Sequence, residues 1–306
     1  MESTISTQNL SPLLPGNTYI FICYSLVCGG KTTFFSQVTA EAAKAPEKFT
    51  VFTVSSDGIR QKLAAEFKKG HQELSDQECF DKVGKMTAKE FDSEIEKAIS
   101  DGKPDKVNIV LADKNYPNGI DKFVQKVGKR GKNVKFVVFV PRITRQILTA
   151  KYKVYFPFSY NYVVQCYLRL KQRKDHENLN GDSDSGRNVF FSFLKLYEGF
   201  KFEERICAGE EFESRIFIVK IAFVDEKNEG KIDGLKGMLD DKIEKLMYKF
   251  KPFNEESLAK KRDKIDDFVK EASRIVDENG IVFVDTQEII KEEIKDLLMN
   301  GIRLEN

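Results

Sequence analysis

A short apolar segment, followed by a glycine turn and a helical pattern, constrains this chain more than any other feature. Residues 18–23 read TYIFIC, which is typical of a buried strand, and helical periodicity begins at Thr32. Between them, residues 25–33 read SLVCGGKTT. This segment matches the GxxxxGK[ST] pattern, with Ser25 in place of the first glycine. The order of strand, loop and helix therefore predicts a phosphate-binding loop.

The residue types of this loop suit phosphate chemistry. Backbone N–H groups of a tight turn can surround phosphates, and the positive end of the following helix adds to their effect. Lys31 would reach the outer phosphates of an NTP, and the Thr32 hydroxyl would ligate Mg²⁺. The alternative is a glycine-rich turn with a chance lysine. The nucleotide-binding candidates of the loop are Ser25, Cys28, Gly29, Gly30, Lys31, Thr32 and Thr33.

Apolar runs alternate with helical patterns along most of the chain. Alternation of this kind indicates βαβ units and a mainly parallel sheet flanked by helices. We therefore predict an α/β fold like that of P-loop NTPases. The further strand candidates are residues 48–54, 107–112, 135–140 and 216–224, and the helical patterns are 59–100, 120–127, 161–173 and 188–200.

The charge pattern changes near residue 229, which suggests three regions. Residues 1–17 are expected to be a flexible leader, and residues 18–228 the sheet domain. Residues 229–306 are strongly charged and mostly helical in pattern, with a short strand at 281–284 and a last helix at 287–298. We expect this extension to pack on the sheet domain.

Composition excludes several chemistries. The chain has two histidines, too few for a histidine-rich zinc site or for a phosphoesterase with paired HxT motifs. Its five cysteines form no CxxC pattern, which is typical of reduced thiols in the cytoplasm or nucleus. No signal peptide and no apolar run of about 18 residues is present, so no membrane partner is expected. The net charge of +2 means that a nucleic acid would need a local basic patch.

Two strand ends have polar residues that suit an acceptor substrate. Asp57 follows the second strand and could accept a proton from an attacking hydroxyl, while Arg60 could hold an acceptor phosphate. Equally, Asp57 could be a helix N-cap and Arg60 a surface residue. Asp113 and Asn115 follow the third strand, where an acid could assist a metal or hydrogen-bond across the cleft, or the segment could simply be a turn. We assign both to the substrate side of the site.

A basic segment, residues 169–176, precedes a loop rich in Gly, Ser and Asp. Arg169 and Arg173 could lie over a transferring phosphoryl group and neutralise its charge, as lid arginines do. A solvated basic helix face is the alternative interpretation.

In this order, the motifs resemble those of polynucleotide 5′-hydroxyl kinases, and more narrowly the kinase module of fungal-type tRNA ligases. That module has Gly-Cys-Gly-Lys-Thr-Thr in its loop, where residues 28–33 read CGGKTT. It has Asp-Arg-Asn-Asn after the third strand, where residues 113–116 read DKNY, and Gln-Arg-Gly-Asp-Asn-His in its lid, where residues 172–176 read QRKDH. The resemblance runs from about residue 18 to residue 248.

The resemblance implies an enzyme that transfers the γ-phosphoryl group of GTP or ATP to the 5′-hydroxyl of RNA, with Mg²⁺ as cofactor. It implies that Lys31 and Thr32 bind the NTP and Mg²⁺, and that Asp57 is the general base. It further implies that Arg60 holds the 3′ phosphate of the acceptor and that Arg173 is a catalytic lid residue, with Arg169 beside it. A P-loop kinase of a small molecule, or a non-catalytic nucleotide-binding subunit of an RNA-processing complex, are the alternatives.

Two other modules of fungal-type tRNA ligases have no counterpart here. Residues 231–234 read KIDG, the KxDG pattern of adenylating ligases, but only 72 residues follow, too few for that fold. Two histidines cannot supply the phosphodiesterase. Sealing and end-opening would therefore require separate ligase and phosphodiesterase proteins.

Overall fold

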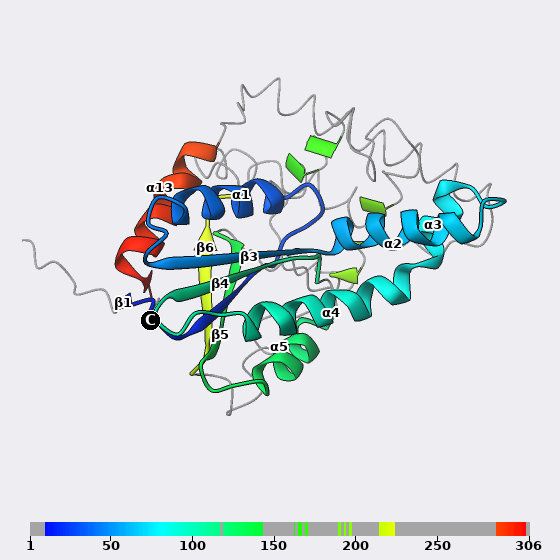
Figure 1. Cartoon of the computed structure of the whole chain (residues 1–306). Coiled ribbons are helices and arrows are strands. Elements are labelled where there is room, and N and C mark those ends of the chain that lie inside the picture. The colour runs from blue at the N-terminus through cyan, green and yellow to red at the C-terminus, as the bar shows by residue number, and fades with distance from the viewer. Residues whose placement is uncertain are drawn as a thin grey trace, which may run out of the picture.

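The sheet domain is built on five parallel strands. The computed structural model describes residues 10–116, 119–142, 214–223 and 286–303, with short stretches between residues 162 and 197. The strand order is β3-β4-β2-β5-β6, with every neighbouring pair parallel (Figure 1). The predicted α/β class, with a mainly parallel sheet, is confirmed. The strands are β2 (Thr18–Cys23), β3 (Phe49–Ser55), β4 (Val107–Asp113), β5 (Val134–Pro141) and β6 (Ile216–Ile221).

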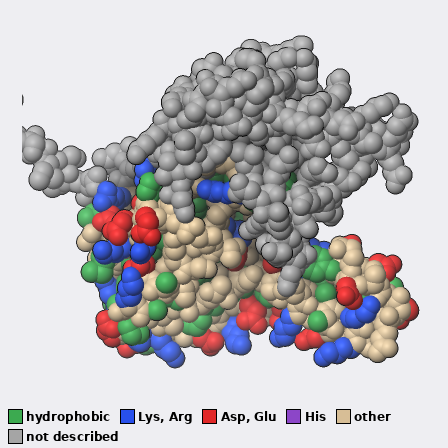
Figure 2. All heavy atoms as spheres, turned by 90° about the horizontal axis from the view of Figure 1, so that it is seen from above, with side chains coloured by type: hydrophobic (Ala, Val, Ile, Leu, Met, Phe, Trp, Pro, Cys, Tyr) green, Lys and Arg blue, Asp and Glu red, His purple; other side chains and the backbone are tan. Residues whose placement is uncertain are grey.

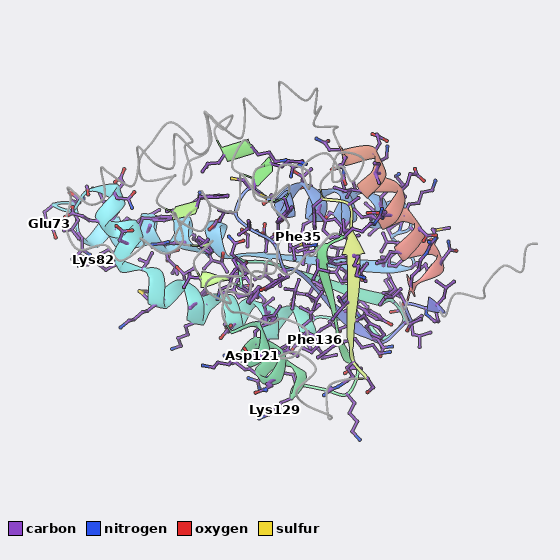
Figure 3. The ribbon with its side chains drawn as sticks, turned by 180° about the vertical axis from the view of Figure 1, so that it is seen from behind. Phe35, Glu73, Lys82, Asp121, Lys129 and Phe136 are labelled. Atoms are coloured by element: carbon purple, nitrogen blue, oxygen red, sulfur yellow. The ribbon has the colours of Figure 1, made fainter. Side chains whose placement is uncertain are left out.

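The central strands are buried along almost their whole length. All six residues of β2 are buried, and so are six of the seven residues of β4. Helices cover both faces of a parallel sheet, which is why these strands are continuous apolar runs rather than alternating ones. Figure 3 shows Phe35 and Phe136 within this core.

Helices lie on both sides of the sheet. In Figure 1, α1 and α13 lie on one side, and α4 and α5 on the other. Each turns an apolar stripe inward, as Phe34, Phe35 and Val38 of α1 and Phe91 and Ile95 of α4 illustrate. The described helices are α1 (Lys31–Ala42), α2 (Ser56–Gly70), α3 (Asp76–Lys82), α4 (Gly84–Ser100), α5 (Ile120–Gly128) and α13 (Gln287–Asn300). No helix in the described ranges is long and apolar enough to cross a membrane.

The helical connections diverge at the neighbouring strands β2 and β4. The chain leaves β2 through α1 on one face, and it leaves β4 through α5 on the other face. Adjacent strands whose connections diverge in this way form a switch point, where ligands bind at the carboxyl ends of the strands. The predicted phosphate loop (residues 25–33) follows β2, and Asp113 is the last residue of β4. Both sequence motifs therefore meet at one end of the sheet.

Helices α2 and α3 form an arm that projects beyond the sheet. Figure 3 places Glu73 and Lys82 at its far end. The arm has a small apolar core of its own around Ala64, Cys79 and Val83. The single helical pattern expected over residues 59–100 is three helices, because the chain turns after Gly70 and a capping box begins α3.

Residues 10–17 are part of the sheet domain, which corrects the boundary of the expected leader. Strand β1 (Leu10–Ser11) pairs antiparallel with β7 (Ile302–Arg303), and Leu13 is buried. The Leu14 amide donates to the Tyr19 hydroxyl at 2.9 Å. Leu13 packs into the core and β1 is paired, so a loose leader does not extend to residue 17. The helices expected over 230–278, the strand at 281–284 and the KxDG segment lie outside the described residues.

Candidate functional site

Two left-handed residues tighten the predicted phosphate loop directly before α1. Gly30 is the residue preceding the helix, with φ of 94°, and Cys28 has φ of 62°, which is uncommon for a residue with a side chain. The first intrahelical bond follows at once, from the Phe34 amide to the Gly30 carbonyl at 2.9 Å. The first N–H groups of α1 have no intrahelical acceptor and can bind an anion.

Close packing explains Gly29, whereas the left-handed backbone, with φ of 94°, favours glycine at position 30. A Cβ on Gly29 would collide with the Tyr162 hydroxyl and would lie 2.8 Å from the Leu26 carbonyl oxygen. The position of a Cβ on Gly30 is 3.7 Å from Arg169 Nη1 and 3.8 Å from Phe223 Cδ1. Tyr162, Arg169 and Phe223 lie far from the loop in sequence, and together they form a wall that packs against it.

Ser25 takes part in this wall through its backbone. Its carbonyl accepts a hydrogen bond from the Tyr197 hydroxyl at 2.9 Å. The Ser25 side chain is fully buried, and its hydroxyl has no hydrogen-bond partner among the described residues. Ser25 therefore shapes the loop through its carbonyl group.

Lys31, Thr32 and Asp113 converge at the switch point. Lys31 Nζ forms an ion pair with Asp113 Oδ1, and Thr32 Oγ1 lies 3.4 Å from Asp113 Oδ2. The side chains of Lys31 and Asp113 are 13% and 11% exposed, so solvent screens this pair weakly. The structure brings Asp113 to the phosphate loop itself.

The oxygens of Thr32 and Asp113 suit a magnesium ion. Mg²⁺ prefers oxygen ligands, and it commonly takes one or two from the protein and the rest from phosphates and water. In the described ranges, no group of three or more His, Cys, Asp or Glu side chains could hold a metal. The pair of oxygens therefore fits a site that is completed by a phosphate ligand.

Asp57 lies in the first turn of α2, and its side chain is exposed. The N-cap of this helix is Ser55, whose Oγ accepts a hydrogen bond from the Gly58 amide at 3.3 Å. The alternative that Asp57 is itself the N-cap is therefore wrong. The Asp57 carboxylate therefore does not cap α2, and the residue lies just after the carboxyl end of β3.

Arg60 ties α2 to α3. Its Nε donates to the Phe80 carbonyl at 2.9 Å, and its guanidinium lies 3.9 Å from the centroid of the Phe80 ring. A weaker contact joins Nη2 to Asp81 Oδ1 at 3.4 Å, where Asp81 is 65% exposed. These contacts give Arg60 a structural role in the arm, so it is more than the surface residue of the alternative interpretation.

The residues after Asp113 combine a half-buried cation with unused polar atoms. Lys114 Nζ lies 5.1 Å from the Phe91 ring centroid and 5.7 Å from that of Tyr116. Burial lowers the pKa of Lys114, while nearby Asp92 opposes that shift. Asn115 Oδ1 and the Tyr116 hydroxyl are buried, with no hydrogen-bond partner among the described residues. Such atoms require a partner, such as water or a bound substrate.

Only part of the expected lid can be placed. Arg169 lies beside Gly30, and its Nη2 donates to the Phe223 carbonyl at 3.0 Å. Arg173 and the rest of residues 171–188 lie outside the described residues.

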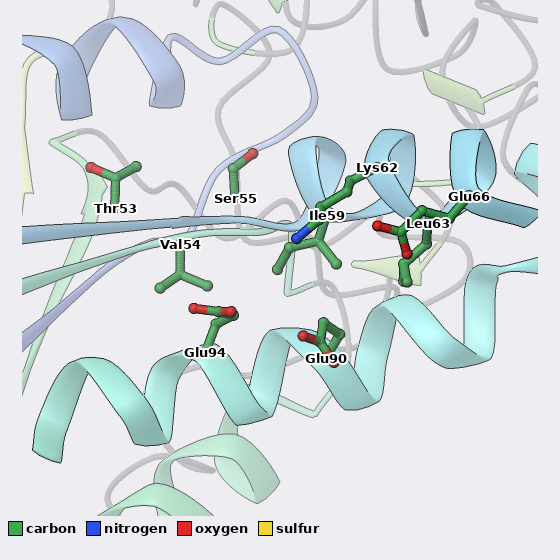
Figure 4. A pocket seen from close by; sticks show the side chains of 9 residues that line it. All are labelled: Thr53, Val54, Ser55, Ile59, Lys62, Leu63, Glu66, Glu90 and Glu94. Atoms are coloured by element: carbon green, nitrogen blue, oxygen red, sulfur yellow. The ribbon is translucent and has the colours of Figure 1, made fainter.

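A separate pocket of about 300 Å³ lies between α2, α4 and the end of β3. In Figure 4, Glu90 and Glu94 extend from α4 toward Val54 and Ile59. Lys62 and Glu66 line it from α2. The sequence pattern did not predict this pocket. Lys62 and Glu66, like Glu90 and Glu94, are four residues apart, which was a signal that each helix presents two charged groups on one face.

Acidic and basic side chains are interspersed over the described surface that Figure 2 shows. This distribution agrees with the net charge of +2 over the whole chain. A polyanionic substrate would have to be held by local contacts rather than by a long-range field.

Comparison with known proteins finds only distant similarity, to solved structures. No protein-family model matches the chain, and no curated protein matches it. Among solved structures, the chain is similar to a fungal RNA kinase, with a TM-score of 0.39 and 15% sequence identity. The alignment covers 83% of this chain and 99% of that one.

Proposed function

We propose that this chain is a P-loop kinase that transfers the γ-phosphoryl group of ATP or GTP to the 5′-hydroxyl of RNA. The observation that supports the proposal most directly is the convergence of Lys31, Thr32 and Asp113 at the switch point. A lysine, a hydroxyl and a carboxylate at the mouth of a phosphate loop are the groups that P-loop enzymes use to hold NTP and Mg²⁺.

The loop and the helix that follows it would hold the donor. Backbone N–H groups at the start of α1 would bind the phosphates, and Lys31 would exchange its ion pair with Asp113 for contacts with the β- and γ-phosphates. Thr32 and Asp113 would hold Mg²⁺, which when bound neutralises charge on the phosphate oxygens. Arg169, beside Gly30, adds a second cation near the same phosphates.

Asp57 would act on the acceptor. Its exposed carboxylate accepts the proton of the 5′-hydroxyl, and the oxygen of that hydroxyl attacks the γ-phosphorus. As the new P–O bond forms, the bond to the β,γ-bridging oxygen breaks and NDP leaves with that electron pair. The sites on β3 and β4 are neighbours because these strands pair in register, with Ser55 opposite Asp113.

The choice of RNA as acceptor rests on the ordered motifs. Asp57 after β3 and residues 113–115 at the end of β4 follow the order of polynucleotide 5′-hydroxyl kinases. Sealing of the phosphorylated RNA end would then require a separate ligase. Opening of the other RNA end, to which it is joined, would require a separate phosphodiesterase.

Acceptor choice is the test of this proposal. The purified chain is incubated with Mg²⁺ and γ-labelled ATP or GTP, together with a 5′-hydroxyl oligoribonucleotide, its 5′-phosphorylated twin, a 5′-hydroxyl DNA or a metabolite pool. We expect label on the 5′-hydroxyl RNA and none on its phosphorylated twin. Label that appears only in the metabolite pool would show a small-molecule kinase, and NTP binding without transfer would show a non-catalytic subunit.

A further inference from the structure

We infer that Glu293 is a positioning residue for the nucleotide site, so that helix α13 is a working part of the kinase proposed above. Glu293 lies in α13, which packs along α1. It is separated by more than 260 residues from the phosphate loop in sequence, yet its carboxylate holds the two strand ends behind that loop.

Both oxygens of Glu293 are engaged at the carboxyl end of the sheet. Oε1 forms an ion pair with Arg142, the residue after β5. Oε2 accepts a hydrogen bond from the Ala222 amide, directly after β6, at 3.2 Å. The Arg142 amide in turn donates to the Ile221 carbonyl at 2.9 Å. One carboxylate therefore fixes the ends of two neighbouring strands.

Phe223 connects this carboxylate to the loop. It follows Ala222, and its amide donates back to the Ile221 carbonyl at 2.8 Å, which makes a tight turn. The Phe223 carbonyl accepts from Arg169 Nη2 at 3.0 Å. Its ring contacts that of Phe34 on α1, with centroids 5.8 Å apart.

Arg169 and Phe223 form the wall against Gly30, with atoms 3.7 and 3.8 Å from the position that a Cβ on Gly30 would take. A shift of the Ala222–Phe223 turn would therefore move the Arg169 guanidinium and loosen packing at the start of α1. Both changes weaken binding of the NTP phosphates. An acceptor site near Asp57, on the other half of the sheet, is not in this series of contacts.

The test compares two adjacent glutamates of α13. Glu293→Gln keeps an oxygen that can accept from Ala222 but loses the ion pair with Arg142, and Glu293→Ala loses both. Glu292→Gln is the matched control, since Glu292 is 67% exposed and pairs with Lys295 on the surface. The measurements are the dissociation constant of a fluorescent NTP analogue, the KM for NTP and for acceptor RNA, the midpoint of thermal unfolding, and hydrogen exchange of the Ala222 and Phe223 amides.

We expect Glu293→Ala to raise the NTP dissociation constant by about twofold to thirtyfold, with faster exchange at residues 222–223. The KM for RNA should stay within about twofold, Glu293→Gln should be intermediate, and Glu292→Gln should match the wild type. If Glu293→Ala binds NTP like Glu292→Gln, the inference is wrong. If the wild-type chain binds no NTP, it is the proposed function that fails, and the exchange data still report whether Glu293 holds the turn.

Discussion

Lys31 of the phosphate loop and Asp113 of β4 form an ion pair across 82 residues of sequence. The contact exists because β4 lies directly beside β2 in the sheet, although β3 lies between them in the chain. Thr32 reaches the second oxygen of the same carboxylate. Asp113 thus joins the donor side of the proposed site.

Asp113→Asn tests the proposed magnesium role. The amide keeps the size of the side chain but removes the negative charge, so we expect a higher Mg²⁺ requirement and a rate lower by about 10²–10³. Phosphoryl transfer is measured across a Mg²⁺ titration. Asp105→Asn, at an exposed residue in the turn before β4, is the control. An unchanged Mg²⁺ dependence in Asp113→Asn would exclude the proposed role.

Substitutions at Asp57 and Ser55 test whether catalysis and helix capping depend on different residues. Because Ser55 is the cap, Ser55→Ala should lower the free energy of unfolding by about 1 kcal/mol and leave phosphoryl transfer largely intact. Asp57→Asn should keep stability nearly unchanged, yet reduce transfer to RNA by about 10²-fold or more. Urea unfolding and initial rates are measured on both variants. Transfer by Asp57→Asn within a few-fold of wild type would contradict its role as base.

Gly29→Ala tests the packing of the loop. The added methyl group would meet the Tyr162 hydroxyl and the Leu26 carbonyl, so the loop must shift and NTP binding should be lost. Gly84→Ala is the matched control, because nothing lies within 4 Å of its Cβ position and alanine favours a helix. Calorimetric titration with NTP and thermal unfolding are measured for both. Normal NTP affinity in Gly29→Ala would show that phosphates bind elsewhere.

Arg60→Ala distinguishes the arm from the acceptor site. Loss of the bond to the Phe80 carbonyl and of the stacking on its ring should lower the free energy of unfolding by about 1–2 kcal/mol. The KM for acceptor RNA should change by less than about threefold, because the arm contacts are structural. A tenfold or larger rise in that KM at unchanged stability would instead support the acceptor-phosphate role that the resemblance implies.

Thiol labelling tests the exposure of the loop. Cys28 is partly exposed, whereas Cys23, Cys79 and Cys166 are buried. Burial raises the pKa of Cys166 to about 12 and raises that of Cys23 further, so both remain protonated and unreactive at pH 8. Iodoacetamide should label Cys28 at pH 8, and bound NTP should protect it.

The control for this labelling is Cys28→Ala, which should lack the NTP-protected adduct in peptide mass spectrometry. This variant also distinguishes labelling of Cys28 from labelling of Cys207, which lies outside the described residues. Labelling of Cys28 at equal rates with and without NTP would place the nucleotide away from the loop.

The sequence predicted the five sheet strands closely, since a strand buried on both faces is a continuous apolar run that can be recognised locally. The local sequence pattern predicted the helices over residues 59–100 less closely, because it did not divide this region into separate helices. The capping box of Ser75 and Glu78, which begins α3, was a readable signal that the helical region is interrupted. The pairing of β1 with β7 could not be predicted, because two short segments almost 300 residues apart have no shared local pattern.

The components of the site were predictable, but most of their contacts were not. The loop, Asp57 and Asp113 each follow a strand, and the rule for parallel sheets predicts that they gather at one edge. The ion pair of Lys31 with Asp113 depends on strand order, and the Arg60 contact depends on how α3 folds back onto α2. Glu293 lies in a charged helix, where nothing in the local sequence distinguishes it from the exposed Glu292.

The pairing of Leu10–Ser11 with Ile302–Arg303 places both ends of the described chain at one point on the surface. Figure 1 shows this point at the end of the sheet away from the arm, and β2 begins only a few residues after β1. Closely spaced ends of this kind are the geometry that tolerates circular permutation. A short linker from residue 303 to residue 10, with new ends opened in the turn at residues 71–74, should therefore preserve the sheet and its switch point. Fusion partners attached directly at residue 10 or residue 303 would emerge side by side, far from the predicted phosphate loop.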